Sequence, residues 1–264
     1  LRIPQIRDGK FSTELFQRYQ RNEQALVLTL MEMVVNGVST RKIARITEEL
    51  CGTEFSASTV SNLCKRLDPI VKGWNERNLD GQAFPFVLVD AIVIKIREDG
   101  RVRPHSVLIA IGINELGHRE ILGMQIGNSE TEASWTEFFN TLKARGLSRV
   151  DLIVSDDHGG LVQAIQTCFQ GVAWQRCQTH FTKNILDACP KKLQAQIKGR
   201  LCTVFEASDI ETSRKLARDI ADEFIEKAPK AVETLESGFD DATAVLALPE
   251  YYRKSCVQPT ASKG

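Results

Sequence analysis

Residues 84–96 decide how the chain folds; they read Phe-Pro-Phe-Val-Leu-Val-Asp-Ala-Ile-Val-Ile-Lys-Ile. Val, Ile, Leu and Phe dominate this stretch, so β-propensity and burial both predict a buried strand. Asp90 stands in its middle. An ionised carboxylate in apolar surroundings is costly unless it is paired, so Asp90 predicts either a metal ligand or a strand-end residue that caps a turn.

A second acidic strand is predicted at residues 150–157, Val-Asp-Leu-Ile-Val-Ser-Asp-Asp. A short His-Gly-Gly segment and an amphipathic run over residues 161–169 follow it. Strands of α/β folds carry functional side chains at their carboxyl ends, next to the following helix, and Asp156 lies at such an end. The second acidic strand therefore strengthens the expectation of a metal site.

The composition is that of a globular protein without an overall charge bias. Of the 264 residues, 42% are hydrophobic and 26% are charged, and the formal net charge is zero, so DNA binding would need local basic surfaces. The sequence has no apolar run of about 18 residues and begins with mixed, charged residues, which predicts neither a membrane span nor a signal peptide. We expect a cytoplasmic, nucleoid-associated protein whose seven cysteines are reduced thiols.

The first 80 residues are predicted to be helical. Apolar spacing predicts a helix or helix pair over residues 11–36. Two short helices follow, one over residues 41–50 and one from Ser56 or Ser58 through Val71. This pattern is typical of a helix-turn-helix, but also of an ordinary αα-hairpin. In the first interpretation, the side chains that would face DNA are Ser58, Thr59, Ser61, Asn62, Lys65 and Arg66.

Beyond a polar linker at residues 75–82, the pattern changes to strands. The first strand and two further strands at residues 106–113 and 119–126 form a predicted antiparallel meander. A helix from Glu132, the second acidic strand, another helix and a fifth strand at residues 172–178 come next. The chain is predicted to be helical beyond His180. A mixed sheet is expected, because the later strands arrive through crossover helices.

Three segments carry a resemblance to a known family: Val89-Asp90-Ala91, residues 154–161 (Val-Ser-Asp-Asp-His-Gly-Gly-Leu) and residues 174–181 (Trp-Gln-Arg-Cys-Gln-Thr-His-Phe). Together with the element order, they make the chain resemble bacterial insertion-sequence transposases of the IS256 and Mutator type. The resemblance implies an α/β fold: a ribonuclease H-like mixed sheet with an N-terminal all-α helix-turn-helix region and an α-helical insertion. The implied regions are DNA binding at residues 1–80, the catalytic core at 81–185, the insertion at 186–250 and an aberrant tail at 251–264.

The resemblance also implies a chemistry. Family members use an Asp, Asp, Glu triad to hold two divalent metal ions, normally Mg²⁺, which together promote phosphodiester cleavage and strand transfer. Asp90 would bridge the ions and Asp156 would hold one of them. Asp157 is the adjacent alternative, but neighbouring side chains of a strand point to opposite faces, and the family match favours Asp156. The implied partners are DNA, both element ends and target, and further copies of the chain, but no membrane.

Other residues of the shared segments allow two interpretations each. Cys177 and His180 match a Cys-x-x-His motif; they are a buried thiol and a hydrogen-bonded imidazole, or His180 acts near the scissile phosphate. His158 caps a loop or belongs to the site. Arg176 and Lys183 bind DNA phosphate or are merely solvated.

The resemblance stops at Lys254. Family members continue with a segment of the type Arg-Thr-Thr-Asn-x-x-Glu-Arg, whereas residues 255–264 read Ser-Cys-Val-Gln-Pro-Thr-Ala-Ser-Lys-Gly. Codons for residues 256–264 can be chosen so that a one-nucleotide shift encodes Arg-Thr-Thr-Asn-Gly-Phe-Glu-Arg. We therefore expect a frameshifted, truncated transposase that lacks its third carboxylate. It is either an inactive form of the enzyme or a protein that acts only as a DNA-binding or inhibitory factor.

Overall fold

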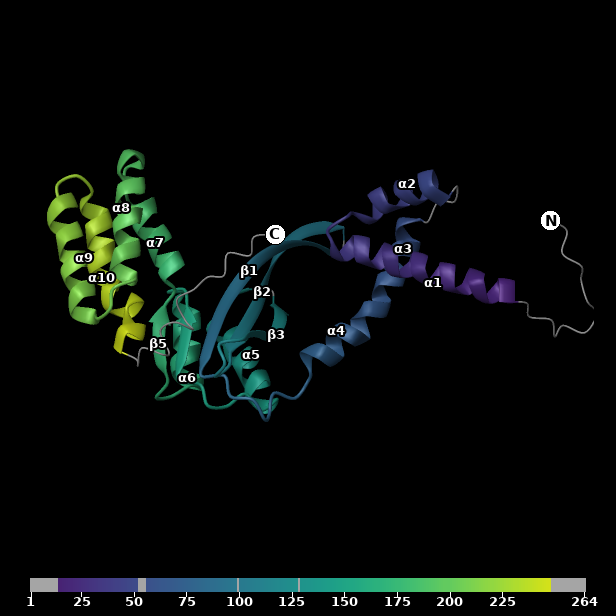
Figure 1. Cartoon of the computed structure of the whole chain (residues 1–264), viewed down its shortest axis with the longest axis horizontal. Coiled ribbons are helices and arrows are strands. Elements are labelled where there is room, and N and C mark those ends of the chain that lie inside the picture. Colours follow the sequence, from purple (N-terminus) through teal and green to yellow (C-terminus); the bar gives the residue numbers. More distant parts are fainter. Residues whose placement is uncertain (1–13, 52–55, 99, 128, 248–264) are drawn as a thin grey trace, which may run out of the picture. The chain divides into compact units, whose positions relative to one another are not determined.

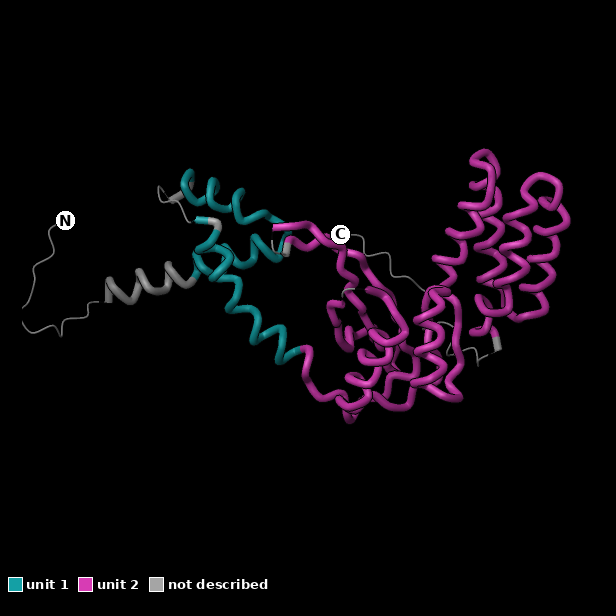
Figure 2. The backbone as a smooth tube through the Cα atoms, turned by 180° about the vertical axis from the view of Figure 1, so that it is seen from behind, with its two compact units in different colours: residues 1–74 teal, residues 75–264 magenta. Residues whose placement is uncertain are grey.

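The computed structural model describes residues 14–51, 56–98, 100–127 and 129–247. The chain divides into two compact units, residues 1–74 and residues 75–264 (Figure 2). Each unit has its own apolar core. The turn expected between the two short N-terminal helices, at residues 52–55, and the tail at residues 251–264 lie outside the described residues.

The N-terminal unit is a set of helices around a small core. The helices are α1 (Glu14–Val35), α2 (Thr40–Cys51), α3 (Ala57–Cys64), the 3-10 helix η1 (Lys65–Leu67) and α4 (Asp68–Asn75) (Figure 1). Leu30, Ile43 and Val60, one from each of the first three helices, are buried together. Ser56 caps α3, because its hydroxyl accepts a hydrogen bond from the Thr59 N–H at 3.1 Å.

The predicted helix from Ser56 through Val71 is interrupted, so that prediction is wrong in its extent. The segment Lys65–Leu67 is a 3-10 helix, and the Asp68 N–H donates to the Lys65 carbonyl. Pro69 explains the interruption, since proline has no N–H and its ring clashes with the carbonyl four positions earlier. Lys65 and Arg66 therefore lie on η1, just beyond α3.

A five-stranded sheet with the order β3-β2-β1-β4-β5 forms the centre of the second unit (Figure 1). Its strands are β1 (Phe86–Glu98), β2 (Arg101–Ile113), β3 (Arg119–Gly127), β4 (Leu152–Ser155) and β5 (Ala173–Arg176). The first three strands form an antiparallel meander, and β4 is parallel to both β1 and β5. This topology, with β1 beside β4, confirms the predicted ribonuclease H-like mixed sheet.

Two layers cover opposite faces of the sheet. α5 (Glu132–Ala144) and α6 (Gly159–Cys168) pack on one face, where Val87 and Val89 contribute to the main core. The 3-10 helix η2 (Ala244–Ala247) lies on the other face, where Phe86 and Leu152 pack with Val245. The odd and even positions of β1 thus alternate between the two layers, as a strand requires.

β1 is buried only in its first part, contrary to the prediction of a buried strand. Ile92, Val93 and Ile94 are 50%, 65% and 37% exposed. The reason is that β4 pairs with β1 only from Phe86 to Leu88, so the rest of β1 extends with β2 beyond the cover of the helices. Asp90 lies at this transition and is itself exposed.

Four helices follow β5 and pack on one another (Figure 1): α7 (Gln178–Asp187), α8 (Lys191–Phe205), α9 (Ile210–Phe224) and α10 (Pro229–Ala242). Asp209 caps α9 by accepting a hydrogen bond from the Thr212 N–H at 2.8 Å. This bond, together with hydrogen bonds from the Thr212 and Ser208 hydroxyl groups, lowers the pKa of Asp209 to about 2. Among the described residues, no helix combines the length and the apolar character needed to cross a membrane.

Gly112 of β2 lies close to buried side chains, so a substitution there tests the packing of the core. A Cβ atom there would lie 2.5 Å from Phe84 Cδ1 and 2.9 Å from Leu122 Cδ2, and Phe84 and Leu122 are fully buried. Gly112→Ala should lower the free energy of unfolding by about 1–3 kcal/mol, as overpacking does. Gly199→Ala is the control, since it adds a methyl group in open space on α8 and should stabilise by about 0.4–1 kcal/mol. Equal stabilities of the two variants in urea denaturation would contradict the described packing.

Candidate active site

The two candidate carboxylates occupy matching positions on neighbouring strands. β1 pairs with β4 so that Phe86 lies beside Leu152, 66 positions later in the sequence (152 minus 86). Asp156 follows Asp90 by the same 66 positions (156 minus 90). The observed pairing ends at Leu88 and Val154; if the same register continued, Asp90 would lie beside Asp156, on the sheet face that Phe86 and Leu152 share.

Asp156 comes directly after β4, and the residue before it is firmly held. Trp174 Nε1 donates to Ser155 Oγ at 2.9 Å, and the Cys177 N–H donates to the Ser155 carbonyl at 2.5 Å. Ser155 Oγ donates in turn to the Asp156 carbonyl at 2.7 Å. The side-chain oxygen Oδ1 of Asp156 nevertheless is buried and has no hydrogen-bond partner within the described part of the chain. A buried oxygen in this state is costly, and a bound cation would satisfy it.

Asp90 offers a more accessible carboxylate. It is exposed, and its Oδ1 accepts a hydrogen bond from the Ala91 N–H at 2.9 Å. Mg²⁺ prefers oxygen ligands and keeps several waters, so two carboxylates at one sheet edge suit it. The residues that the structure describes contain no group of three or more metal-ligating side chains. They fit two of the three expected ligands, Asp90 and Asp156.

Asp157 differs from Asp156 because it already has a partner. Arg176 Nη1 lies 3.0 Å from Asp157 Oδ2, and the arginine side chain is only 11% exposed. A third charge lies nearby on α10, where burial raises the pKa of Asp241 and the negative charge of Asp157 raises it further. The ion pair favours Asp156 over Asp157 as a metal ligand, on grounds independent of strand alternation.

Three other predicted site residues lie at the N-termini of α6 and α7. Cys177 is the N-cap residue of α7 and His180 lies in its first turn, and both are half-buried. His158 is the N-cap residue of α6, and its Nδ1 lies 3.7 Å from Glu130 Oε1. His158 thus occupies a capping position, but its side chain makes no capping hydrogen bond among the described residues. The roles of all three stay predictions.

The remaining predicted DNA contacts are exposed. Lys183 lies on the surface of α7. On α3 and η1 the exposed side chains are Ser58, Thr59, Ser61, Asn62, Lys65 and Arg66, whereas Val60 between them is buried. A recognition helix needs this orientation, but a solvated αα-hairpin has it too.

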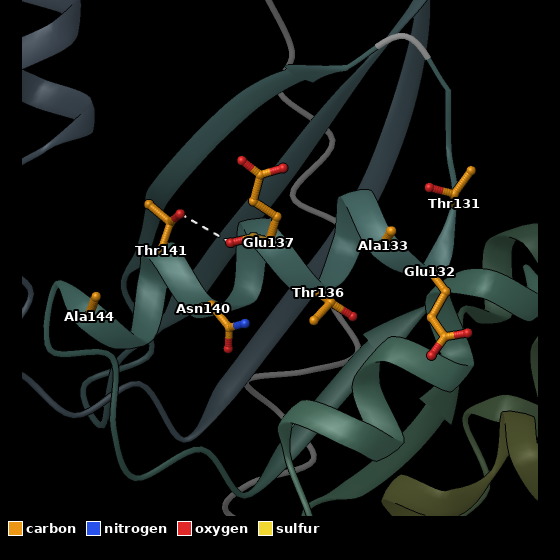
Figure 3. A pocket seen from close by; sticks show the side chains of 8 residues that line it. All are labelled: Thr131, Glu132, Ala133, Thr136, Glu137, Asn140, Thr141 and Ala144. Atoms are coloured by element: carbon orange, nitrogen blue, oxygen red, sulfur yellow. Dashed lines mark hydrogen bonds between the residues drawn. The ribbon is translucent and has the colours of Figure 1, made fainter.

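A surface hollow in the second unit involves none of these residues. It follows the outer side of α5 (Figure 3), and its lining residues are Thr131, Glu132, Ala133, Thr136, Glu137, Asn140, Thr141 and Ala144. The hollow is therefore separate from the predicted site residues.

Sequence reasoning missed three residues that hold the site in place. Trp174 fixes Ser155, as described, and Gln175 Oε1 accepts a hydrogen bond from the Val245 N–H at 2.6 Å, which ties η2 to β5. Both lie within the family segment at residues 174–181, so a signal existed. Gly238 of α10 contacts Phe181 and Arg176, and no local pattern marks it.

The two adjacent aspartates should differ in their effects on stability. Asp156→Ala removes a buried, unpartnered oxygen and should raise the free energy of unfolding by about 1 kcal/mol, as active-site replacements often do. Asp157→Ala leaves the buried guanidinium of Arg176 without its carboxylate partner. This change should lower the free energy of unfolding by about 1–3 kcal/mol. Thermal and urea unfolding of both variants measure the difference. A loss of stability in Asp156→Ala as large as in Asp157→Ala would show that Asp156 has a structural partner.

The amino-acid sequence is similar to those of known proteins. Residues 1–260 match the family described as "Transposase, Mutator family". The transposase for insertion sequence element IS256 in transposon Tn4001 of Staphylococcus aureus is 45% identical over 244 residues, which is 92% of this chain and 63% of the relative. The transposase for element ISRM5 of Rhizobium meliloti is 42% identical over 254 residues, 96% of this chain and 64% of the relative.

The chain thus spans 63–64% of the length of these curated relatives. Among solved structures, the HTLV-2 integrase catalytic core domain in complex with magnesium matches with a TM-score of 0.24 and 11% identity, over 49% of this chain and 88% of that one. A TM-score this low does not support a fold assignment. The fold is therefore assigned from the strand order observed in this chain. The match to residues 1–260 and the identities above show the family: this chain belongs to the Mutator family of transposases.

Proposed function

We propose that this chain is the DNA-binding and catalytic part of an insertion-sequence transposase that cleaves element ends and joins them to target DNA. The observation that supports the proposal is the β1–β4 register, which, if continued beyond Leu88 and Val154, would bring Asp90 and Asp156 side by side in a member of this family. Assembly into homo-oligomers and association with the nucleoid belong to the same proposal.

Asp90 and Asp156 would hold divalent metal ions. Such ions stabilise the charge that develops on the phosphodiester and lower the pKa of the attacking hydroxyl group. The protein's own part is to fix the two carboxylates. Ser155 and its contacts to β5 hold the Asp156 backbone, and pairing with β2 holds Asp90. His180, one helical turn beyond β5, is our candidate for contact with the phosphate.

Residues 255–264 contain neither Asp nor Glu. We therefore propose that strand transfer needs a third carboxylate, which these ten residues do not supply. Two carboxylates alone do not hold both ions in the productive arrangement.

A chimaera tests the catalytic assignment. Residues 1–254 of this chain, joined to the segment that follows in the IS256 relative, should cleave DNA carrying the terminal repeats of its own element in the presence of Mg²⁺. Asp90→Ala or Asp156→Ala should abolish cleavage, because each removes a metal ligand, and Asp157→Ala should reduce it far less. Asp151→Ala, an exposed aspartate just before β4, is the matched control and should leave cleavage unchanged. An active Asp156→Ala variant would disprove the assignment.

The DNA-binding role of the N-terminal unit predicts a salt effect. Lys65→Ala combined with Arg66→Ala should weaken binding to duplex DNA and make the plot of log affinity against log salt shallower by about two, one for each lost phosphate contact. Fluorescence anisotropy at several salt concentrations measures the slope. The control is Lys191→Ala combined with Lys192→Ala, an exposed pair on α8, which should keep the slope of the parent chain. An unchanged slope in the Lys65/Arg66 variant would leave α2 and α3 as an ordinary helical hairpin.

A further inference from the structure

Arg176 occupies an unusual position for a residue expected to contact DNA. It is the last residue of β5 and lies beside Ser155 in the sheet register. Its side chain is 11% exposed, its Nη1 pairs with Asp157 at 3.0 Å, and its Cζ lies 4.7 Å from the centre of the buried Phe181 ring. Such a guanidinium is enclosed by protein groups and is poorly placed to reach a DNA backbone.

The same guanidinium also joins the loop after β4 to the helical insertion. When the Asn184 amide takes the orientation that satisfies both of its ends, its oxygen accepts from Arg176 Nη2 at 3.0 Å and its nitrogen donates to the His180 carbonyl at 3.2 Å. On α10, a Cβ atom at Gly238 would lie 2.7 Å from Arg176 Nη1 and 2.6 Å from Phe181 Cε2. Asp241, one helical turn later, interacts electrostatically with both Arg176 and Asp157.

Asp156 therefore lies between two anchored neighbours. Ser155 is held by Trp174 and by the Cys177 N–H, and Asp157 is held by Arg176. The Asp156 carboxylate between them has a buried oxygen that no described group satisfies. The anchors hold the residues on either side of Asp156, and so limit movement of the backbone that carries its carboxylate.

We propose that Arg176 is a positioning residue, which holds Asp157 and thereby aims the Asp156 carboxylate at the metal, and that α10 supports it through Gly238. This inference rests on the proposed metal site at Asp90 and Asp156. It assigns Arg176 a different role from the predicted phosphate contact. Groups that orient a ligand from outside the coordination sphere typically change metal affinity by about 10–100-fold.

The sign of the effect separates positioning from simple electrostatics. Arg176 is a cation close to the proposed metal ligand, so removing its charge alone should tighten the binding of a divalent cation. Loss of positioning should weaken it instead. Arg176→Gln thus gives opposite results under the two explanations, and Arg176→Lys, which keeps the charge but not the planar fork, should fall between Arg176→Gln and the parent chain.

The experiment is a Mn²⁺ titration of the 264-residue chain labelled with ¹⁵N-tryptophan. Paramagnetic broadening of the Trp174 indole signal reports binding, because Trp174 Nε1 is hydrogen-bonded to the residue before Asp156. We expect Arg176→Gln, Asp157→Asn and Gly238→Ala each to raise the Mn²⁺ concentration for half-broadening about tenfold or more. The Arg176→Gln/Asp157→Asn double variant should be no weaker than the weaker single variant, since both changes break one contact.

Arg214→Gln is the matched control, because Arg214 pairs with Asp240 at 2.8 Å and lies 5.9 Å from the Phe239 ring centre, but at a more exposed position. It should leave the titration unchanged. Should Arg176→Gln not fold, Gly238→Ala still decides the question, because it disturbs the support of Arg176 without changing any charge near the metal; Asp157→Asn does not, since loss of its negative charge would weaken cation binding under either explanation. Unchanged or tighter Mn²⁺ binding in the folded variants of Arg176 and Gly238, with weaker binding in Asp90→Asn and Asp156→Asn, would overturn the positioning role alone. Parent-like binding in Asp90→Asn and Asp156→Asn would overturn the proposed metal site as well.

Discussion

The parallel pairing of β1 with β4 is the interaction on which the rest of the site depends. It covers only Phe86 to Leu88 on β1, yet it sets the register on which the proposed pairing of Asp90 with Asp156 depends. A shift of that register by one residue would turn one carboxylate to the face covered by α5 and α6. The buried side chains of Phe86 and Leu152, together with η2 behind them, oppose such a shift, because it would expose them.

Much of the fold could be predicted because its signals are local. Alternating apolar residues, glycine turns and helix caps specify the meander and the crossover helices, whereas the expected pairing of Asp90 with Asp156 came from the family resemblance. The interruption at Lys65–Leu67 also has a local cause, Pro69. Pro69 cannot donate the helical hydrogen bond to the carbonyl four positions earlier. A search for apolar spacing does not take that hydrogen bond into account.

Other features depend on contacts between distant segments. Ile92, Val93 and Ile94 have the composition of a buried strand, but β4 and the helices do not reach them, and burial is decided by neighbours rather than by composition. Arg176 resembles a phosphate-binding arginine in the sequence. Only the folded chain shows that Asp157 and Phe181 surround it and that Gly238 leaves room for it.

The loop after β4 combines firm anchoring with one unsatisfied oxygen, and these two properties require each other. If Asp156 were mobile, its carboxylate could turn toward water and avoid the desolvation penalty of burial. The carboxylate would then lose conformational entropy each time a cation bound. The loop is instead ordered when the chain folds. Trp174 and Cys177 donate hydrogen bonds to Ser155, and Asp157 forms an ion pair with Arg176, so less entropy is lost when a cation binds. The stability that these contacts supply is thus what allows the chain to retain, just after β4, a carboxylate oxygen that no described group satisfies.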